Sequence, residues 1–234
     1  MVLPARRLLL FDIDGTLITC RGRAGDALAR ALNTTFGTPG PVATYRYSGK
    51  TDPQIVHELM AGAGLPRAAV ASRLSEVFAT YLATLEDALR GVATPLAGVR
   101  ELLDSLAARD DVALGLLTGN IEPGARIKLR EAGLDGYFAI GAFGSDDEVR
   151  NNLVPVARER ARARWGDDFP GARTVVIGDA MADILCARAG GARAVAVASG
   201  WTDRAELAAL SPDALLDSRE PPAALAAILD GHTA

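Results

Sequence analysis

Short runs of aliphatic residues alternate along this chain with segments of helical periodicity. Four runs have the length and composition of strands that are buried on both faces: Leu8–Phe11, Val112–Leu117, Thr174–Ile177 and Ala194–Ala198. Between them, apolar residues recur at helical spacing, as in Leu96–Ala108. This alternation predicts an α/β fold with a Rossmann-like open parallel sheet and helices on both of its faces.

The stretch between the first two predicted strands is too long for one crossover helix. Residues 24–36, 53–63 and 67–89 have patterns typical of helices, and turns that contain glycine or proline separate them. We therefore expect a small all-α cap domain at residues 18–90. Residues 1–17 and 91–234 would then form the α/β core domain.

Composition excludes several classes of function. The 234 residues are 49% hydrophobic, and 25 basic against 29 acidic residues give a net charge of −4. A mildly acidic chain without basic blocks is poorly suited to bind nucleic acid or an anionic membrane. No apolar run approaches the ~18 residues of a membrane-spanning helix, and the two cysteines, Cys20 and Cys186, are far apart in the chain. We expect a cytoplasmic monomer or homodimer.

Polar residues follow three of the predicted strands. Asp12 and Asp14 come after the first strand, Thr118 and Gly119 after the second, and Asp179 after the third. Open α/β sheets bind their ligands at the carboxyl ends of the strands. One such ending could arise by chance, but three of them predict a functional site at this edge of the sheet.

These strand ends carry motifs that resemble those of the haloacid dehalogenase-like hydrolase superfamily. The motifs are Asp12-Ile13-Asp14-Gly15-Thr16, Leu117-Thr118-Gly119-Asn120 and Gly178-Asp179-Ala180-Met181-Ala182-Asp183. With the helical insert, which is similar to a C1-type cap, the chain most resembles the phosphoglycolate phosphatase-like branch. The resemblance implies a Mg²⁺-dependent phosphatase that hydrolyses a small phosphorylated metabolite, phosphoglycolate-like or a sugar phosphate.

The resemblance and the chemistry of carboxylates assign roles to four aspartates. Asp12 would be the nucleophile that forms an aspartyl-phosphate, and Asp14 the general acid and base. Mg²⁺ prefers oxygen ligands; it would be held by Asp12, by Asp179 and by the backbone carbonyl of Asp14. Asp183 lies one helical turn beyond Asp179 and would orient a metal-bound water.

The phosphate needs donors and a positive charge. Thr118 offers a hydroxyl group, and Gly119 lets a backbone N–H approach a phosphate oxygen at a helix N-terminus. For the cation there are two candidates. Lys128 falls on the apolar stripe of a helix predicted at residues 121–132 and could reach back toward Thr118. Arg150 lies where the superfamily usually has a Lys-Pro pair, although Arg150-Asn151 stands here. We favour Lys128 and keep Arg150 as the alternative.

In the predicted cap, residues 47–52 form a polar, glycine-containing turn before a helix. Ser48 and Lys50 are its candidate substrate contacts, with Lys50 meeting an anionic group. The same turn is also typical of a helix start capped by Thr51 or Asp52, and the two interpretations are compatible.

Other functions fit the sequence less well. Gly49-Lys50-Thr51 lacks the leading glycine of a P-loop, because position 44 is Thr44. His57-Glu58 lacks the second histidine of a zinc motif, because position 61 is Ala61. A phosphomutase that uses the same two aspartates is the alternative enzyme, and a noncatalytic binding protein on the same fold is the second alternative.

Overall fold

A six-stranded parallel sheet forms the centre of the computed structural model, which describes residues 6–198 and 200–229. The strand order is β5-β4-β1-β6-β7-β8, and every neighbouring pair is parallel. The strands are β1 (Arg7–Phe11), β4 (Val112–Thr118), β5 (Ile140–Phe143), β6 (Thr174–Gly178), β7 (Arg193–Val197) and β8 (Ala214–Leu216). The predicted α/β fold is confirmed, although β5 and β8 were not predicted from the sequence.

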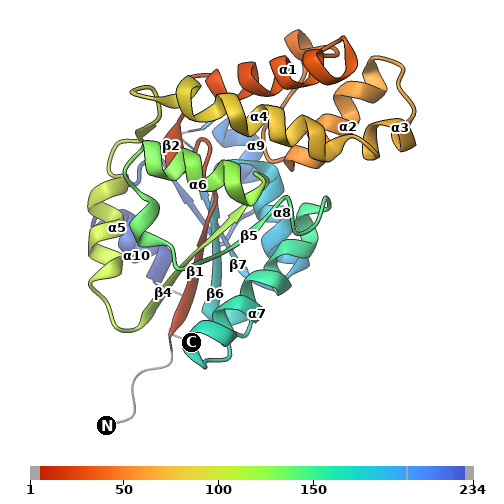
Figure 1. Ribbon diagram of the computed structural model, residues 1–234. Helices are drawn as coiled ribbons and strands as arrows, with labels where there is room; N and C mark the ends of the chain where they lie inside the picture. Colours follow the sequence, from red (N-terminus) through yellow and green to blue (C-terminus); the bar gives the residue numbers. More distant parts are fainter. Residues whose placement is uncertain (1–5, 199, 230–234) are drawn as a thin grey trace.

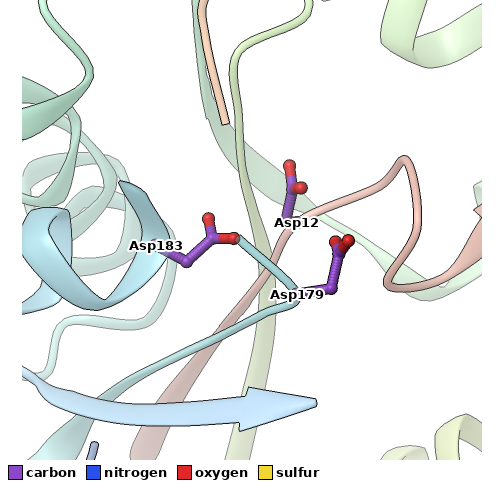
Figure 2. A group of neighbouring side chains, drawn as sticks. All are labelled: Asp12, Asp179 and Asp183. Carbon is purple, nitrogen blue, oxygen red and sulfur yellow. The ribbon is translucent and has the colours of Figure 1, made fainter. Parts of the chain in front are cut away.

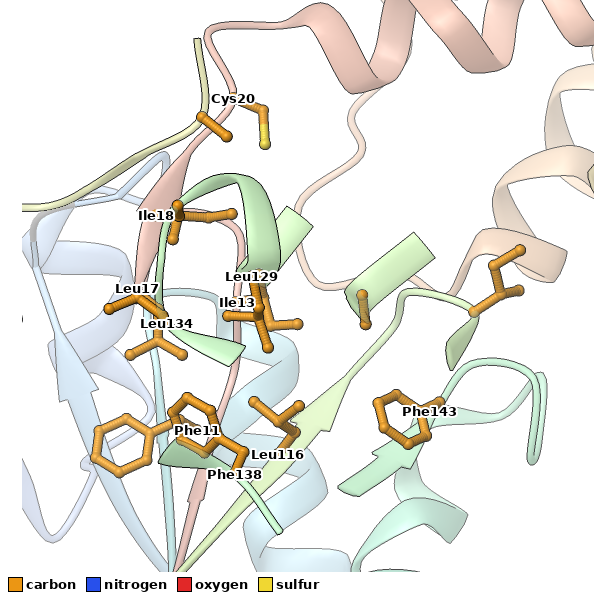
Figure 3. Close-up of a cluster of buried hydrophobic side chains, with 14 of the residues drawn as sticks. Phe11, Ile13, Leu17, Ile18, Cys20, Leu116, Leu129, Leu134, Phe138 and Phe143 are labelled. Carbon is orange, nitrogen blue, oxygen red and sulfur yellow. The ribbon is translucent and has the colours of Figure 1, made fainter. Parts of the chain in front are cut away.

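Successive strand residues are buried on opposite faces of the sheet. Leu9 and Phe11 of β1 belong to one hydrophobic cluster, and Leu8 and Leu10 belong to a second one. The first cluster is covered by α5 (Val99–Ala107), α6 (Glu122–Glu131) and α10 (Ala223–Leu229). The second is covered by α7 (Leu153–Trp165), α8 (Met181–Ala189) and α9 (Arg204–Ala209). Figure 1 shows helices on both sides of the sheet, and Figure 3 shows part of the first cluster.

The segment between β1 and β4 is largely helical, as predicted. Its two ends meet in a two-stranded antiparallel sheet, β2 (Ile18–Thr19) with β3 (Thr94–Pro95). Between them lie α1 (Arg23–Phe36), α2 (Asp52–Gly62), α3 (Arg67–Ala71) and α4 (Leu74–Leu89), which we call the helical insert. Short 3₁₀ helices complete the fold: η1 (Val42–Thr44), η2 (Asp135–Tyr137), η3 (Arg150–Asn152) and η4 (Gly171–Arg173).

Two predicted helices differ from those observed. The helix expected at 67–89 is divided, because the Ser72 hydroxyl group donates to the Ala69 carbonyl and Arg73 leaves the helical conformation, with φ −118° and ψ 8°. The helix expected from Leu96 begins at Val99, because Gly98 precedes it with φ 75°. The pattern of apolar residues gives no information on the backbone conformation at these positions. Neither difference could therefore be predicted from it.

The helical insert packs over the carboxyl ends of the strands (Figure 1). α4 packs against α6, and the insert's buried residues Leu28, Leu59 and Leu85 belong to the same hydrophobic cluster as Phe11 of β1. The insert therefore shares a continuous apolar contact with one face of the core. Among residues 6–198 and 200–229, no helix combines the length and the apolar character needed to cross a membrane.

Leu116 in β4 tests the packing of this core. Its side chain is 0% exposed, so Leu116→Ala should lower the free energy of unfolding by roughly 2–5 kcal/mol, through lost burial and the cavity left behind. Urea denaturation measures the change. Val149→Ala is the control: Val149 is 56% exposed, and its truncation should change stability by no more than about 0.5 kcal/mol. Equal effects of the two substitutions would contradict the core described here.

Candidate active site

Three aspartates from three elements gather where β1 and β6 end (Figure 2). Asp12 directly follows β1, Asp179 follows β6, and Asp183 lies in the first turn of α8. β1 and β6 are hydrogen-bonded neighbours with Phe11 opposite Ile177, so the turns that follow them lie side by side. One carboxylate oxygen from each aspartate lies within 4.8 Å of the other two, and all three residues are buried. The sequence predicted Asp12 and Asp179 from the strand ends and Asp183 from its place one helical turn beyond Asp179.

The electrostatics of this cluster favour a positive charge at its centre. Burial raises the pKa of Asp12 to about 7; Arg150 opposes the shift, whereas Asp183 and Asp179 add to it. Burial also raises the pKa of Asp179 to about 6, and Asp183 adds to that shift. Three buried carboxylates with oxygens within 4.8 Å of one another supply the oxygen ligands that hard divalent cations prefer. The residues therefore fit a divalent metal ion.

Gly15 and Thr16 of the first motif hold Asp179 in place. The Thr16 hydroxyl group donates to Asp179 Oδ1 at 2.8 Å. Gly15 has φ +84°, and a Cβ atom there would lie 2.4 Å from Asp179 Oδ2, so only glycine fits this close approach. The Gly15 carbonyl in turn accepts from the buried guanidinium group of Arg219. The first motif thus supplies both Asp12 and the support for Asp179.

Arg150 contacts Asp12, the candidate nucleophile. Its buried guanidinium Nη2 is 3.1 Å from Asp12 Oδ1 and also contacts Asp183 Oδ1. Nη1 donates to the Gly49 carbonyl of the helical insert at 3.4 Å. Arg150 therefore joins the aspartate cluster to the insert, and it brings a permanent positive charge next to Asp12.

Lys128 is paired with Asp14, the other aspartate of the first motif. Its Nζ is 2.6 Å from Asp14 Oδ2 and 2.5 Å from Asn120 Oδ1. Burial opposes ionisation of Asp14, but the Lys128 ammonium and hydrogen bonds from Lys128 and Asn120 outweigh it, so the pKa of Asp14 lies below its usual value. Each of the two candidate cations is thus paired with a different aspartate.

The second motif places its hydroxyl group and its glycine at the same edge. Thr118 is fully buried, and its Oγ1 accepts from the Asn120 side chain at 2.8 Å. A Cβ atom on Gly119 would lie 2.0 Å from the Lys50 carbonyl oxygen. Gly119 is therefore required where the insert backbone crosses the motif.

The start of α2 docks on the second motif. The Asp52 N–H donates to the Gly119 carbonyl at 2.7 Å, and Asp52 Oδ2 accepts from the Ile121 N–H at 2.8 Å. Thr51 accepts from Gln54 N at 3.3 Å, which confirms the predicted capped helix start, and its hydroxyl group donates to the Glu148 carbonyl at 2.8 Å. Burial raises the pKa of Asp52 to about 6, with Lys128 opposing.

Ser48 and Lys50, the candidate substrate contacts of the insert, line the same cleft as Asp12 and Asp14. The Lys50 ammonium is already paired within the insert, because its Nζ lies 2.5 Å from Glu58 Oε2 and 3.2 Å from the Tyr45 hydroxyl group. An anionic substrate would therefore compete with Glu58 for Lys50.

Sequence reasoning missed three residues at the site. Asn120 was part of a recognised motif but had no assigned role; its position next to Thr118 was the available signal. Trp201 and Arg219 had no such signal. The backbone N–H of Trp201 donates to Asp179 Oδ2 at 3.3 Å. Trp201 and Arg219 both lie in segments far from the motifs in sequence, and only the fold brings them to β1 and β6.

Comparisons with known proteins show which family the chain resembles. A family model described as haloacid dehalogenase-like hydrolase matches residues 7–191. The phosphoglycolate phosphatase of Agrobacterium fabrum is 29% identical over 225 residues, which are 92% of this chain and 89% of that protein. The tyrosine-protein kinase PtkA of Mycobacterium tuberculosis is 30% identical over 196 residues, 83% of this chain and 62% of that protein.

Solved structures show the same fold. CbbY from Rhodobacter sphaeroides, in complex with xylulose-(1,5)bisphosphate, superposes with a TM-score of 0.72 at 19% identity and covers 95% of this chain and 99% of that one. A predicted phosphatase from Clostridium acetobutylicum superposes with a TM-score of 0.71 at 16% identity, covering 92% and 94%. Because the family model spans most of the chain and every predicted motif, the chain belongs to the haloacid dehalogenase-like hydrolases, and its prediction as an enzyme is confirmed.

Proposed function

We propose that this enzyme is a Mg²⁺-dependent phosphatase that hydrolyses a small phosphorylated metabolite through an aspartyl-phosphate intermediate. One observation carries the proposal: Asp12 and Asp14, two residues apart, lie in different electrostatic surroundings. Asp12 is buried beside Asp179, Asp183 and Arg150, whereas Asp14 is paired with Lys128 and its side chain is 38% exposed. Two carboxylates in different surroundings can take two different roles. In the free protein the pKa of Asp12 is raised and that of Asp14 is lowered. A bound cation would favour the ionised form of Asp12, and an anionic phosphoryl group beside Asp14 would favour the protonated form of Asp14.

In the first step the Asp12 carboxylate attacks phosphorus. A bond forms between an Asp12 oxygen and phosphorus, and the bond to the leaving oxygen breaks. Asp14, which is protonated once the anionic phosphoryl group lies beside it, gives the leaving oxygen its proton. In the second step Asp14 takes a proton from water as the water oxygen bonds to phosphorus. The bond to Asp12 then breaks, and inorganic phosphate leaves with both aspartates restored.

Mg²⁺ would be held by Asp12, by Asp179 and by the backbone carbonyl of Asp14, with Asp183 orienting a metal-bound water. When bound, it would supply positive charge that offsets the negative charges of the attacking carboxylate and the phosphoryl group. The raised pKa values of Asp12 and Asp179 support this assignment, because their ionised forms lack full compensation from the protein alone.

The phosphoryl group would be bound by Thr118, Gly119 and Arg150. The contact of Arg150 with Asp12 favours Arg150 over Lys128 as the phosphate partner, since the phosphoryl group must reach Asp12. This reverses the preference from sequence.

Residues 18–90 would act as the cap domain and residues 1–17 and 91–234 as the core, with Ser48 and Lys50 facing the substrate. The docking of Asp52 on Gly119 and Ile121 supports this role, because it closes the insert over the strand ends and limits the access of water. The similarity to a phosphoglycolate phosphatase supports a phosphoglycolate-like substrate, with a sugar phosphate as the alternative.

Asp12→Asn tests the function directly. With Mg²⁺, the wild-type protein should release phosphate from at least one member of a panel that contains phosphoglycolate, sugar phosphates and nucleotides. The variant should lose turnover by at least ~10⁴-fold, because an amide is a poor nucleophile and the covalent step is lost. Phosphate release, ranked by kcat/KM, measures the effect, and circular dichroism confirms that the variant is folded.

Three results would contradict the proposal. Full activity of folded Asp12→Asn would exclude Asp12 as the nucleophile. Conversion of a bisphosphorylated sugar with little phosphate release would indicate the phosphomutase, and no turnover of any panel member would favour the noncatalytic alternative.

Asp179→Asn tests the metal site without relying on activity. Mg²⁺ at about 100 times its Kd should stabilise the wild-type protein by about 2.7 kcal/mol, which corresponds to a rise of roughly 5–10 °C in Tm, and a chelator should reverse it. The variant removes one of three mutually repelling carboxylates. Its Tm without metal should therefore match or exceed that of the wild type, and Mg²⁺ should no longer raise it. A wild-type Tm that does not respond to Mg²⁺ would exclude this cluster as the site.

Arg150→Ala tests the phosphate partner. Loss of a preorganised positive charge at the phosphoryl group should lower kcat by about 10²–10³-fold, whatever the leaving group. Arg126→Ala is a matched control, because Arg126 is partly exposed and pairs with Glu122 on α6; its kcat should match the wild type. A folded Arg150→Ala variant with wild-type kcat would remove Arg150 from the mechanism.

A further inference from the structure

Lys128 is a charged residue that is buried on the apolar face of α6. It is one of only two lysines in the chain, and it is 4% exposed on the face of α6 that packs against the core and the insert. Burying an ammonium group is costly unless charged and polar partners surround it. Its partners here are Asp14 Oδ2 at 2.6 Å and Asn120 Oδ1 at 2.5 Å.

Asn120 closes this arrangement into a triangle. Its Nδ2 donates to Asp14 Oδ2 at 2.8 Å, the same oxygen that Lys128 contacts, and also to Thr118 Oγ1 at 2.8 Å. One oxygen of Asp14 therefore accepts two hydrogen bonds from buried groups. The Asp14 side chain is nevertheless 38% exposed, against 5% for that of Lys128. The carboxyl group is therefore held by buried partners and still lines the cleft.

Arg150 makes the corresponding contact with the other aspartate. Its guanidinium group contacts Asp12 and Asp183. The two cations are thus paired with different carboxylates. Any effect of Lys128 on the reaction would pass through Asp14.

We propose that Lys128, together with Asn120, is a positioning residue that fixes the Asp14 carboxyl group in the orientation needed for proton transfer to the leaving oxygen. The inference rests on the proposed phosphatase function. In the step concerned, the bond from phosphorus to the leaving oxygen breaks as Asp14 passes its proton to that oxygen and Asp12 bonds to phosphorus. Lys128 neither gains nor loses a proton and does not contact the phosphoryl group.

The leaving group separates this role from phosphate binding. An alkyl phosphate must have its leaving alkoxide protonated, whereas p-nitrophenyl phosphate releases a stable phenolate without an acid. For an enzyme with a covalent intermediate, kcat/KM reports the steps through release of the leaving group. A residue that acts through Asp14 should therefore affect kcat/KM for alkyl phosphates alone, and a residue that binds phosphate should affect both.

Lys128→Met, which keeps the length of the side chain and removes its charge, is the test. With the alkyl phosphate ranked first in the panel, kcat/KM should fall by about 10²-fold, the scale of a displaced or lost general acid. With p-nitrophenyl phosphate it should fall less than about threefold. Asn120→Ala should show the same dependence on the leaving group, which keeps the proposal testable should Lys128→Met not fold. Arg130→Met, on the exposed side of the same helix and paired with Glu86, should change neither value.

A double-mutant cycle strengthens the test. Asp14→Asn should show the same dependence on the leaving group, and adding Lys128→Met to it should cause little further loss, because residues that act as a unit are not additive. Equal losses of kcat/KM for both substrates in Lys128→Met, or no loss for either, would overturn the proposal. If the wild-type protein hydrolyses neither substrate, the phosphatase function itself fails, which is a distinct result.

Discussion

The site depends on the balance of charge at the carboxyl end of β1. Asp12 is followed two residues later by Asp14, and the fold brings Asp179 and Asp183 against Asp12. Burying this much negative charge is unfavourable unless positive charge compensates it. Arg150 and Lys128 supply that charge from two sides, and the remaining excess around Asp12 and Asp179 makes the cluster suited to a divalent cation. The positions of both cations follow from this requirement.

The same requirement explains why the insert and the core cannot be treated separately. Arg150 donates to the Gly49 carbonyl, and Asp52 accepts from Ile121 at the start of α6, the helix that carries Lys128. Residues 49–52, which lead into α2, therefore contact Arg150 and the start of the helix that carries Lys128. Because the insert also shares a hydrophobic cluster with the core, displacement of the insert would expose the pairs to water and weaken their electrostatic interactions.

Much of this could be predicted from the sequence, for identifiable reasons. The strands β1, β4, β6 and β7 are buried on both faces and so form continuous apolar runs. Asp12 directly follows β1, and Asp179 directly follows β6. β5 and β8 were missed because they are short edge strands, four and three residues long, whose composition is not distinctive. Trp201 and Arg219 were missed because their contacts with Asp179 and Gly15 exist only in the folded chain.

The choice between Lys128 and Arg150 shows where sequence reasoning reaches its limit. Helical periodicity correctly placed Lys128 on a buried face, and motif order correctly brought Arg150 to the site, but neither pattern specifies which aspartate a long side chain meets. That depends on where the helices lie relative to β1: α6 is on the sheet face that packs against the insert, and Arg150 precedes α7 on the opposite face. Since Asp12 and Asp14 are reached from these two directions, each cation finds the carboxylate nearest its own helix. The two were alternatives for one role in the sequence, and in the fold each is paired with a different aspartate.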